Sequence, residues 1–320
     1  MTSNDEQTQT ARKVLYGGQA VVEGVMIRGR EHAAMSIRRD DGTIVRHSID
    51  LSWWSNLRIR KIPVLRGVAV LGETLVVGMQ ALSISASEAA PPDEETGERE
   101  ELGRGGMAVM LFLSLVVGIG IFFLLPLFIS RLAENAGANA FTANIVEGLV
   151  RLGIFVGYIW IIGKMNDIRR VFGYHGAEHM SVAAHEASEP LTVDSVRRFP
   201  EAHPRCGTSF LMTVVVVSII LFIFIPREPL WMLVGSRIVL IPVITAISYE
   251  LIRYAGMHPT QFWVRMLGAP NLWLQELTTR PPEDAMIEVA IDAMNYALEL
   301  DGVVYEPKGG MVSPGANSGQ

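Results

Sequence analysis

Four of the seven histidines fall within 29 residues of one another, and two of them have the spacing of a metal-binding pair. His175 and His179 are four residues apart, which places both side chains on one face of a helix. With Glu178 they form the pattern H-x-x-E-H, the inverted form of a zinc-protease motif. In that chemistry two neutral imidazoles bind the metal, and the carboxylate takes a proton from the metal-bound water. The pattern therefore predicts a metal site with Glu178 as its general base.

A zinc site needs further protein ligands, and two candidates follow in the same segment. His203 and Cys206 have the spacing H-x-x-C. Either one would complete a three-ligand catalytic site with an open position, whereas both together would close a four-ligand structural site. Glu186 lies about 10 Å beyond His179 along a helix and is too far away to share the metal. We therefore predict a Zn²⁺ cofactor and leave the third ligand, and the catalytic or structural role of the metal, open.

The overall composition is typical of a membrane protein. Charged residues make up 19% of the 320 residues, and the mean hydropathy is +0.30. The net charge of −6 resides in residues 88–101, which hold seven acids and one arginine, so the rest of the chain is balanced. Without a basic excess to hold a polyphosphate backbone, nucleic acid is not an expected partner. The single cysteine excludes an internal disulfide. The expected partner is a lipid bilayer, and the sequence specifies neither a substrate nor an oligomeric state.

Long apolar runs predict four transmembrane helices, at 107–129, 141–163, 208–225 and 230–252. The first contains 23 uncharged residues, enough to cross a hydrocarbon core about 30 Å thick. Two of the runs contain charged residues, which are Glu147 and Arg151 in one and Arg237 and Glu250 in the other. Ionisable groups at membrane depth normally face the protein interior or a wet cavity. We therefore expect pairing between helices, with a functional pathway as the alternative.

The distribution of basic residues predicts the orientation. Six lysines and arginines lie in 164–207, whereas 130–140 and 226–229 contain one each. The positive-inside rule then places both termini and 164–207 in the cytoplasm of a multi-pass plasma-membrane protein. Residues 63–86 are also apolar, but they contain an arginine, a glutamate and several small residues. We interpret them as an amphipathic or re-entrant helix rather than a full span.

The predicted fold class is a mainly α-helical integral membrane protein with about four transmembrane helices and a small cytoplasmic α+β portion. Its expected parts are an N-terminal cytoplasmic segment at 1–62, the membrane-associated helix at 63–86, an acidic linker at 87–106, a first transmembrane pair at 107–163, a histidine-rich metal loop at 164–207, a second transmembrane pair at 208–252 and a cytoplasmic C-terminal region at 253–320. The C-terminal region includes an amphipathic helix at 283–300, which we expect to pack on the N-terminal segment.

Within the N-terminal segment, alternating apolar and polar residues predict a β-hairpin. Its arms are 33–39 and 44–51, and Asp41-Gly42 forms the turn. The earlier pair Gly17-Gly18 belongs to neither nucleotide-binding glycine motif, so we expect it to allow close backbone packing or a turn. Glu23 lies in the same block, and the sequence assigns it no role.

Several blocks of the sequence resemble those of one family. They are GGQAVVEGVMIRG (17–29), residues 66–75, YHGAEH (174–179), HPRCGTSF (203–210), SYELIR (248–253) and LWLQELTTRPPED (272–284). Together they resemble the YqhQ-like proteins, an uncharacterised family of bacterial inner-membrane proteins described as predicted metal-dependent enzymes. The resemblance covers the chain from about residue 16 to 295. It implies a metal site formed by His175, Glu178, His179, His203 and Cys206, and it implies no particular reaction.

Two hypotheses about function follow. The first is a membrane-embedded zinc hydrolase with its site at the cytoplasmic face, acting on a membrane peptide or a lipid-linked compound. The second is a non-enzymatic scaffold or transporter-like protein in which a structural zinc clips the histidine loop. An exchangeable water on the metal would favour the first hypothesis, and a closed set of four protein ligands would favour the second.

Overall fold

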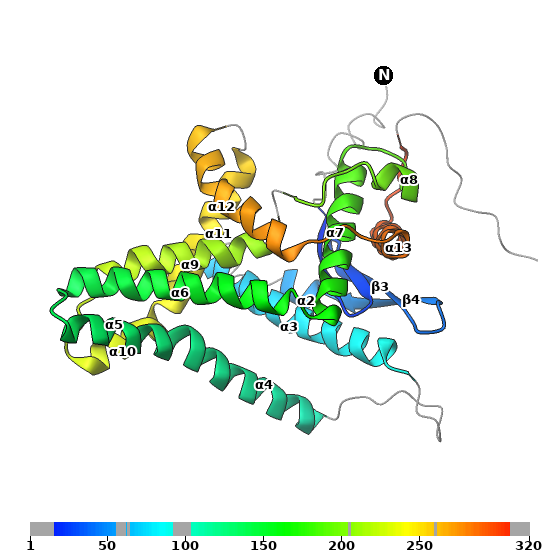
Figure 1. The fold of residues 1–320 in the computed structure, drawn as a ribbon. Helices are drawn as coiled ribbons and strands as arrows, with labels where there is room; N and C mark the ends of the chain where they lie inside the picture. Colours follow the sequence, from blue (N-terminus) through cyan, green and yellow to red (C-terminus); the bar gives the residue numbers. More distant parts are fainter. Residues whose placement is uncertain are drawn as a thin grey trace, which may run out of the picture.

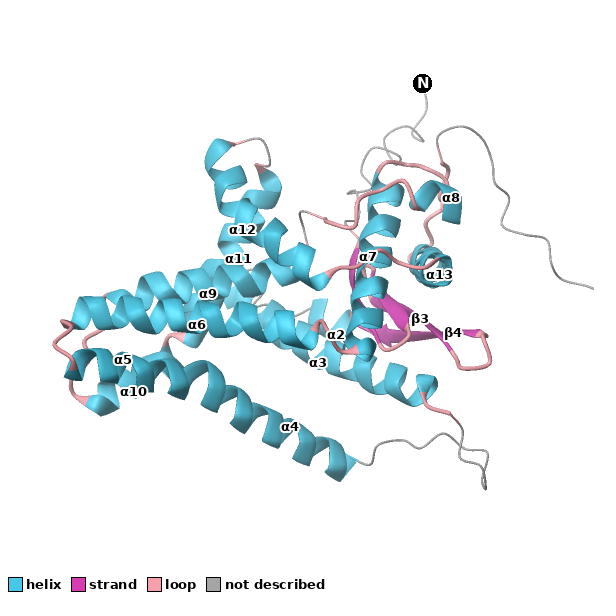
Figure 2. Cartoon of the chain, in the orientation of Figure 1, coloured by secondary structure: helices cyan, strands magenta, loops and turns pink. Residues whose placement is uncertain are grey.

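The computed structural model describes residues 16–55, 62, 65–91, 104–203, 206–258 and 261–307. Over these residues the chain is mainly helical and contains one small sheet (Figure 2). Apolar helices lie side by side at one end of the molecule, and the sheet with its covering helices lies at the other (Figure 1). The metal-site motif is on α7, in the sheet-containing part.

The sheet has four antiparallel strands in the order β1-β2-β3-β4. The strands are β1 (Gly17–Val21), β2 (Gly24–Arg28), β3 (His32–Arg38) and β4 (Ile44–Asp50). The turn between β3 and β4 is the one expected at Asp41-Gly42: the Asp41 carboxylate accepts the Thr43 N–H at 2.8 Å, and Gly42 has φ +85°. The β1–β2 hairpin was not among the expected elements. At Gly18, a Cβ would fall 2.1 Å from the Met26 carbonyl oxygen, so the glycine permits close backbone packing.

The two faces of the sheet are covered by different helices, α7 (Asn166–Glu186) with α13 (Asp284–Leu300) on one face and α3 (Leu65–Ala89) on the other. Alternation along the strands sends Ile27 to the α7 side and Met26 to the α3 side. The helix expected at 283–300 corresponds to α13. Its apolar stripe is buried at Met286, Val289, Ala290, Ala293 and Ala297.

The bundle contains most of the remaining helices. They are α4 (Arg104–Ile119), the π-helix η2 (Gly120–Leu124), α5 (Leu125–Asn135), α6 (Ala140–Ile162), α9 (Thr208–Ile223), α10 (Leu230–Val239) and α11 (Ile241–Met257). α12 (Phe262–Thr278) packs on α9 and has no counterpart among the expected helices. Two short helices, α2 (Ser52–Ser55) and α8 (Val193–Val196), complete the described elements.

The helix expected over 230–252 is broken. α10 and α11 meet at Leu240 with a bend of 40°. The reason is local, because Pro242 lies in the first turn of α11 and has no N–H to continue the hydrogen-bond ladder of α10. The single helix predicted there is therefore corrected to a bent pair.

Among the described residues, three helices are long and apolar enough to cross a membrane, and a fourth span results if the bent pair counts as one. The three are α3, the continuous run Phe112–Asn135, and α6. Three of the four expected spans have a counterpart among these candidates: Phe112–Asn135, α6 and the bent pair. α3 was expected only to associate with the membrane. α9 was expected to cross it, but its apolar part, Phe210–Ile223, is shorter than the three candidate spans.

Candidate metal centre

α7 orients its two histidines through hydrogen bonds to backbone carbonyls. His175 Nδ1 donates to the Thr278 carbonyl at 2.8 Å, and His179 Nδ1 donates to the Glu201 carbonyl at 2.5 Å. A carbonyl only accepts, so both Nδ1 atoms carry a proton, and in the neutral rings both Nε2 atoms are left as the ligand or acceptor atoms. Metal-ligating histidines are usually fixed in this way.

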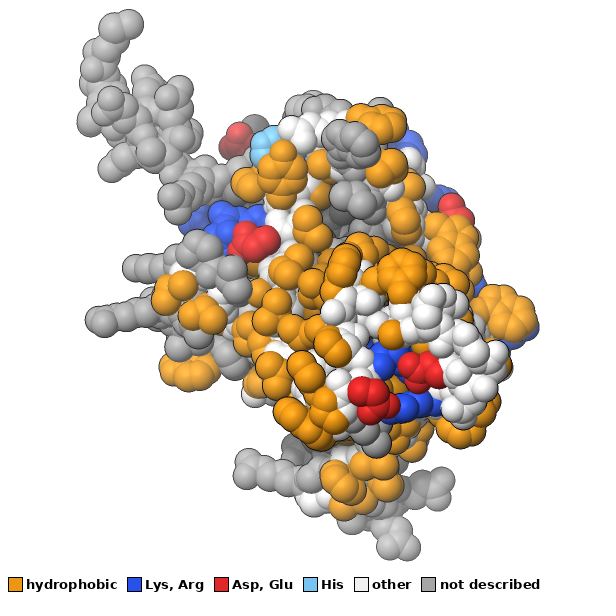
Figure 3. Space-filling view, turned by 90° about the vertical axis from the view of Figure 1, so that its left-hand side faces the viewer, with side chains coloured by type: hydrophobic (Ala, Val, Ile, Leu, Met, Phe, Trp, Pro, Cys, Tyr) orange, Lys and Arg blue, Asp and Glu red, His pale blue; other side chains and the backbone are white. Residues whose placement is uncertain are grey.

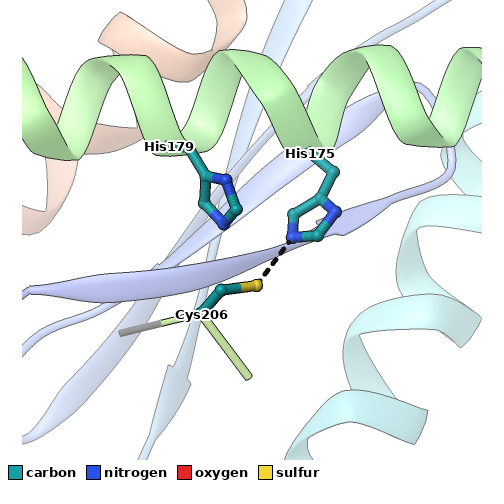
Figure 4. Close-up of side chains that lie close together, drawn as sticks. All are labelled: His175, His179 and Cys206. Atoms are coloured by element: carbon teal, nitrogen blue, oxygen red, sulfur yellow. Dashed lines mark hydrogen bonds between the residues drawn. The ribbon is translucent and has the colours of Figure 1, made fainter. Parts of the chain in front are cut away.

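Three of the four predicted ligands converge. His175, His179 and Cys206 each offer one ligand atom, and these atoms all lie within 4.8 Å of one another. His175 Nε2 lies 3.1 Å from Cys206 Sγ, and both rings extend from α7 toward the sulfur (Figure 4). The Nε2 atom of His179 is buried and makes no hydrogen bond with any described residue. A buried nitrogen without a partner is costly unless something else binds it.

Cys206 reaches the histidines from the turn before α9. Thr208 makes two hydrogen bonds with the Cys206 sulfur, one through its Oγ1 at 3.1 Å and one from its backbone N–H at 3.4 Å. Such partners hold a ligating thiolate in place. The donor set of two imidazole nitrogens and one thiolate is one that zinc accepts. The residues present therefore fit the metal that the sequence predicts.

His203 is not a member of the converging group, although it lies next to it. Its ring centroid is 5.9 Å from that of His179, and its Nε2 faces Glu186 Oε2 at 3.4 Å. Burial and the neighbouring His179 lower the pKa of His203 to about 4, so its imidazole is neutral at physiological pH. Glu186, which the sequence places too far along the helix to share the metal, instead contacts His203.

Glu178 is buried beside the histidines. Its Oε2 lies 3.6 Å from His179 Nε2, and only 3% of the residue is exposed. Burial raises the pKa of Glu178 to about 7, against the opposing effects of His175 and a hydrogen bond from the Gly18 backbone. A carboxyl group with such a pKa can take up and release a proton near neutral pH, as a general base must.

Comparison with known proteins identifies the family. Residues 62–300 match the family described as protein of unknown function (DUF1385). The chain belongs to the DUF1385 family. It is also 36% identical over 298 residues to the uncharacterized protein YqhQ of Bacillus subtilis (strain 168), an alignment covering 90% of this chain and 93% of that protein. No solved structure matches the chain. The comparisons support the YqhQ-like resemblance and supply no activity.

In this DUF1385 chain, Glu23 joins α7 to the sheet through side-chain hydrogen bonds. The backbone of Glu23 has φ +50° in the β1–β2 turn, and its carboxylate accepts two hydrogen bonds from Arg170, both at 2.6 Å. Tyr174, one turn along α7 and next to His175, adds a third at 3.2 Å. Arg170 holds the pKa of Glu23 below its usual value. The sequence left Glu23 without a role, and its partner is 147 residues away.

Gln275 on α12 is a second residue that the sequence did not single out. Its buried amide accepts the His203 N–H at 2.9 Å and donates to the His203 carbonyl at 3.0 Å. This two-point contact fixes the backbone of His203, which lies in the chain between Glu201 and Cys206. Both α12 and the β1–β2 turn therefore position a site whose ligands lie on α7 and before α9.

Proposed function

We propose that this DUF1385 protein is a membrane-embedded, zinc-dependent hydrolase whose site lies at the cytoplasmic face. The observation that supports this most strongly is the convergence of His175, His179 and Cys206, with the Nε2 atom of His179 buried and without a hydrogen bond to any described residue. Three protein donors with a further position open is the arrangement of a catalytic zinc.

When bound, zinc acts as a Lewis acid and lowers the pKa of a coordinated water to about 7. His175 and His179 hold their Nε2 atoms ready for the ion, because backbone carbonyls fix both rings. Glu178 accepts a proton at its carboxylate and later returns it to the leaving group. The burial of His179 and Glu178 keeps bulk water away from the reacting atoms.

The membrane location rests on the apolar helices. Phe112–Asn135 and α6 expose many large apolar side chains, among them Phe112, Leu113, Leu115, Leu149, Trp160 and Ile161. Exposed apolar surface on this scale is unfavourable in water and favourable in lipid. The first half of α3 packs on α11, and its second half covers the sheet. This placement favours the predicted membrane-associated helix over a full span.

The alternative is a scaffold or transporter-like protein with a structural zinc clip, and one observation favours it. His203 lies next to His179, with a neutral ring. If that ring turned toward the ion, the site would have four protein ligands and no open position.

Cobalt substitution tests the choice between these proposals. We expect purified full-length protein to bind about one Co²⁺ per chain, with an absorption spectrum that changes as the pH is raised through neutrality. Glu178→Gln should keep the cobalt, alter that change and abolish hydrolysis of para-nitrophenyl laurate. A spectrum that is independent of pH and unaffected by Glu178→Gln would contradict the hydrolase and favour the clip. Absence of bound metal would contradict both.

A further inference from the structure

A cavity of about 340 Å³ lies between the sheet and α3, beside the candidate metal centre. Its walls come from β1, β2, β3, α3 and the turn before α9. Residues on these walls include Gly17, Gly18, Met26, Thr74, Val77 and Gly207. A volume of this size is within the usual range for small-molecule sites.

Two of these glycines connect the cavity to the metal centre. Gly207 directly follows Cys206 in the chain. Gly18 adjoins the general-base candidate, since a Cβ on it would lie 3.1 Å from Glu178 Oε1. A molecule held in the cavity against Gly18 and Gly207 would therefore contact residues that adjoin Glu178 and the candidate ligand Cys206.

The lining of the cavity favours an uncharged, largely apolar occupant. Met26, Ala33 and Val77 supply apolar surface. Among the described lining residues Arg28 alone carries a formal charge, and its Nη2 lies 2.5 Å from Glu73 Oε1, so the two charges offset each other. Such a cavity would bind a phosphate or a carboxylate poorly, because it offers no unbalanced positive charge.

The edge of the sheet argues against a peptide bound as an added strand. That mode requires free backbone N–H groups along β1, which within the described part of the chain has a strand partner on one side only. The Gly18 backbone already hydrogen-bonds Glu178, and the Val22 N–H donates to Ser85 Oγ at 3.2 Å. In addition, one wall of the cavity is α3, a helix apolar enough to lie in lipid.

We infer that the cavity binds the aliphatic chain of a lipid-like amphiphile and places the polar end of that molecule beside Glu178. This inference rests on the proposed hydrolase and deepens it, because it assigns the substrate to the lipid-linked class. The glycines at the metal end leave room for the polar end, and the apolar residues on β2, β3 and α3 contact the chain.

Photolabelling tests the inference in full-length protein reconstituted in lipid nanodiscs. The probe is a diazirine analogue of dodecanol, and labelled peptides are identified by mass spectrometry. Gly17→Leu adds a bulky side chain to the cavity wall at a position where a Cβ meets no atom within 4 Å. Gly157→Leu is the matched control: it also meets no atom within 4 Å, but it lies on α6. We expect labels on residues 16–19 and 74–77, reduced about tenfold by Gly17→Leu and unchanged by Gly157→Leu.

Equal labelling of wild type and Gly17→Leu would overturn the inference. So would loss of labelling on competition with an apolar peptide but not with dodecanol, which would assign the cavity to peptides. Zinc content, measured in the same samples, is expected to be unchanged by Gly17→Leu. If the protein binds no zinc and the labelling pattern still holds, the hydrolase proposal fails while the chain-binding cavity stands.

Discussion

Two clusters of buried polar side chains lie at opposite ends of the molecule, and they differ in how their central groups are paired. The far cluster joins α5, α6 and α10 at the end of the bundle. On the surface of that end a few charged side chains are visible in a largely hydrophobic face (Figure 3). Both carboxylate oxygens of Glu147 accept hydrogen bonds there, from Arg151, Arg227 and Arg237 at 2.9–3.3 Å. Arg227 also pairs with Glu134 at 2.5 Å.

The metal-centre cluster is built in the opposite way. Its outer atoms are fixed by carbonyls and by Gln275, yet the inner Nε2 of His179 has no hydrogen bond among the described residues. Burial of polar groups alone therefore does not indicate a functional site. The difference lies in the central group: both oxygens of Glu147 are satisfied within the chain, although Nη1 of Arg151 beside it has no hydrogen bond among the described residues, whereas at the metal centre the inner nitrogen itself is unsatisfied.

Among the variants that test this comparison, removal of a proposed ligand from the candidate metal centre should have the largest effect, which is on zinc affinity. We expect His179→Ala to weaken zinc binding by more than about 100-fold, since loss of an outer-shell partner alone costs about 10–100-fold. Zinc per chain after equilibration with a competing chelator measures this. His185→Ala is the control, because that ring packs on Tyr16 and Tyr305 instead. Full zinc content in His179→Ala would show that His179 does not hold the metal.

Removing the centre of the far cluster should affect stability and leave metal binding unchanged. Glu147→Ala leaves three buried guanidinium groups without their shared carboxylate, a change that costs about 3–5 kcal/mol. Thermal or denaturant unfolding in detergent should show this loss, while zinc affinity in the folded protein stays the same. A large change in zinc affinity without a change in stability would mean that the two ends are coupled.

A smaller effect is expected from the residue that positions the metal-site turn. Gln275→Leu removes the Gln275 partner of the His203 N–H and one of the donors to the His203 carbonyl, which keeps the Cys206 N–H at 3.2 Å, at a cost of about 1–3 kcal/mol in stability. Zinc affinity should fall about tenfold, because the turn carries Cys206. Gln261→Leu, in an exposed contact with Tyr254, should change neither quantity. Equal effects of the two variants would contradict a positioning role for Gln275.

The smallest effect should come from Glu23→Gln and should depend on pH. In the folded chain Arg170 lowers the pKa of Glu23 below its ordinary value of 4.5. The ion pair therefore stabilises the fold fully above pH 4.5, and this stabilisation is lost as the pH falls through the lower pKa of the folded state. The Arg170 side chain is 48% exposed, which limits the contribution to about 1 kcal/mol or less. Unfolding measured across acidic pH should show wild type and variant converging at the lowest pH. A difference in stability between wild type and variant that stays constant across acidic pH would exclude the Glu23–Arg170 ion pair as its source.

The sequence predicted the site best where the signal is local. His175 and His179 lie on one helix face because of their spacing, and Asp41-Gly42 forms the turn its residue types favour. Pro242 is also a local signal and marks the break in the last apolar run. The sequence treated His203 and Cys206 as equal candidates for the third ligand. Choosing between them needs their distances from His175 and His179, which the spacing of residues along the chain does not give.

The features that the sequence did not predict depend on contacts between residues that are far apart in the chain. Gln275 lies 72 residues from His203, and Arg170 lies 147 residues from Glu23, so neither pair follows any helical or strand period. The double role of α3, packed on α11 in its first half and on the sheet in its second, likewise depends on where the other elements lie. Its hydropathy alone does not distinguish this arrangement from a full span.

X-ray absorption at the zinc edge of the purified full-length protein tests the central claim most directly. We expect about one zinc per chain, bound by two imidazole nitrogens at about 2.0–2.1 Å and one sulfur at about 2.3 Å, with a light atom in the fourth position. In Cys206→Ser the sulfur signal should vanish. Zinc without a sulfur ligand in the wild-type protein, or no bound zinc, would contradict the centre formed by His175, His179 and Cys206.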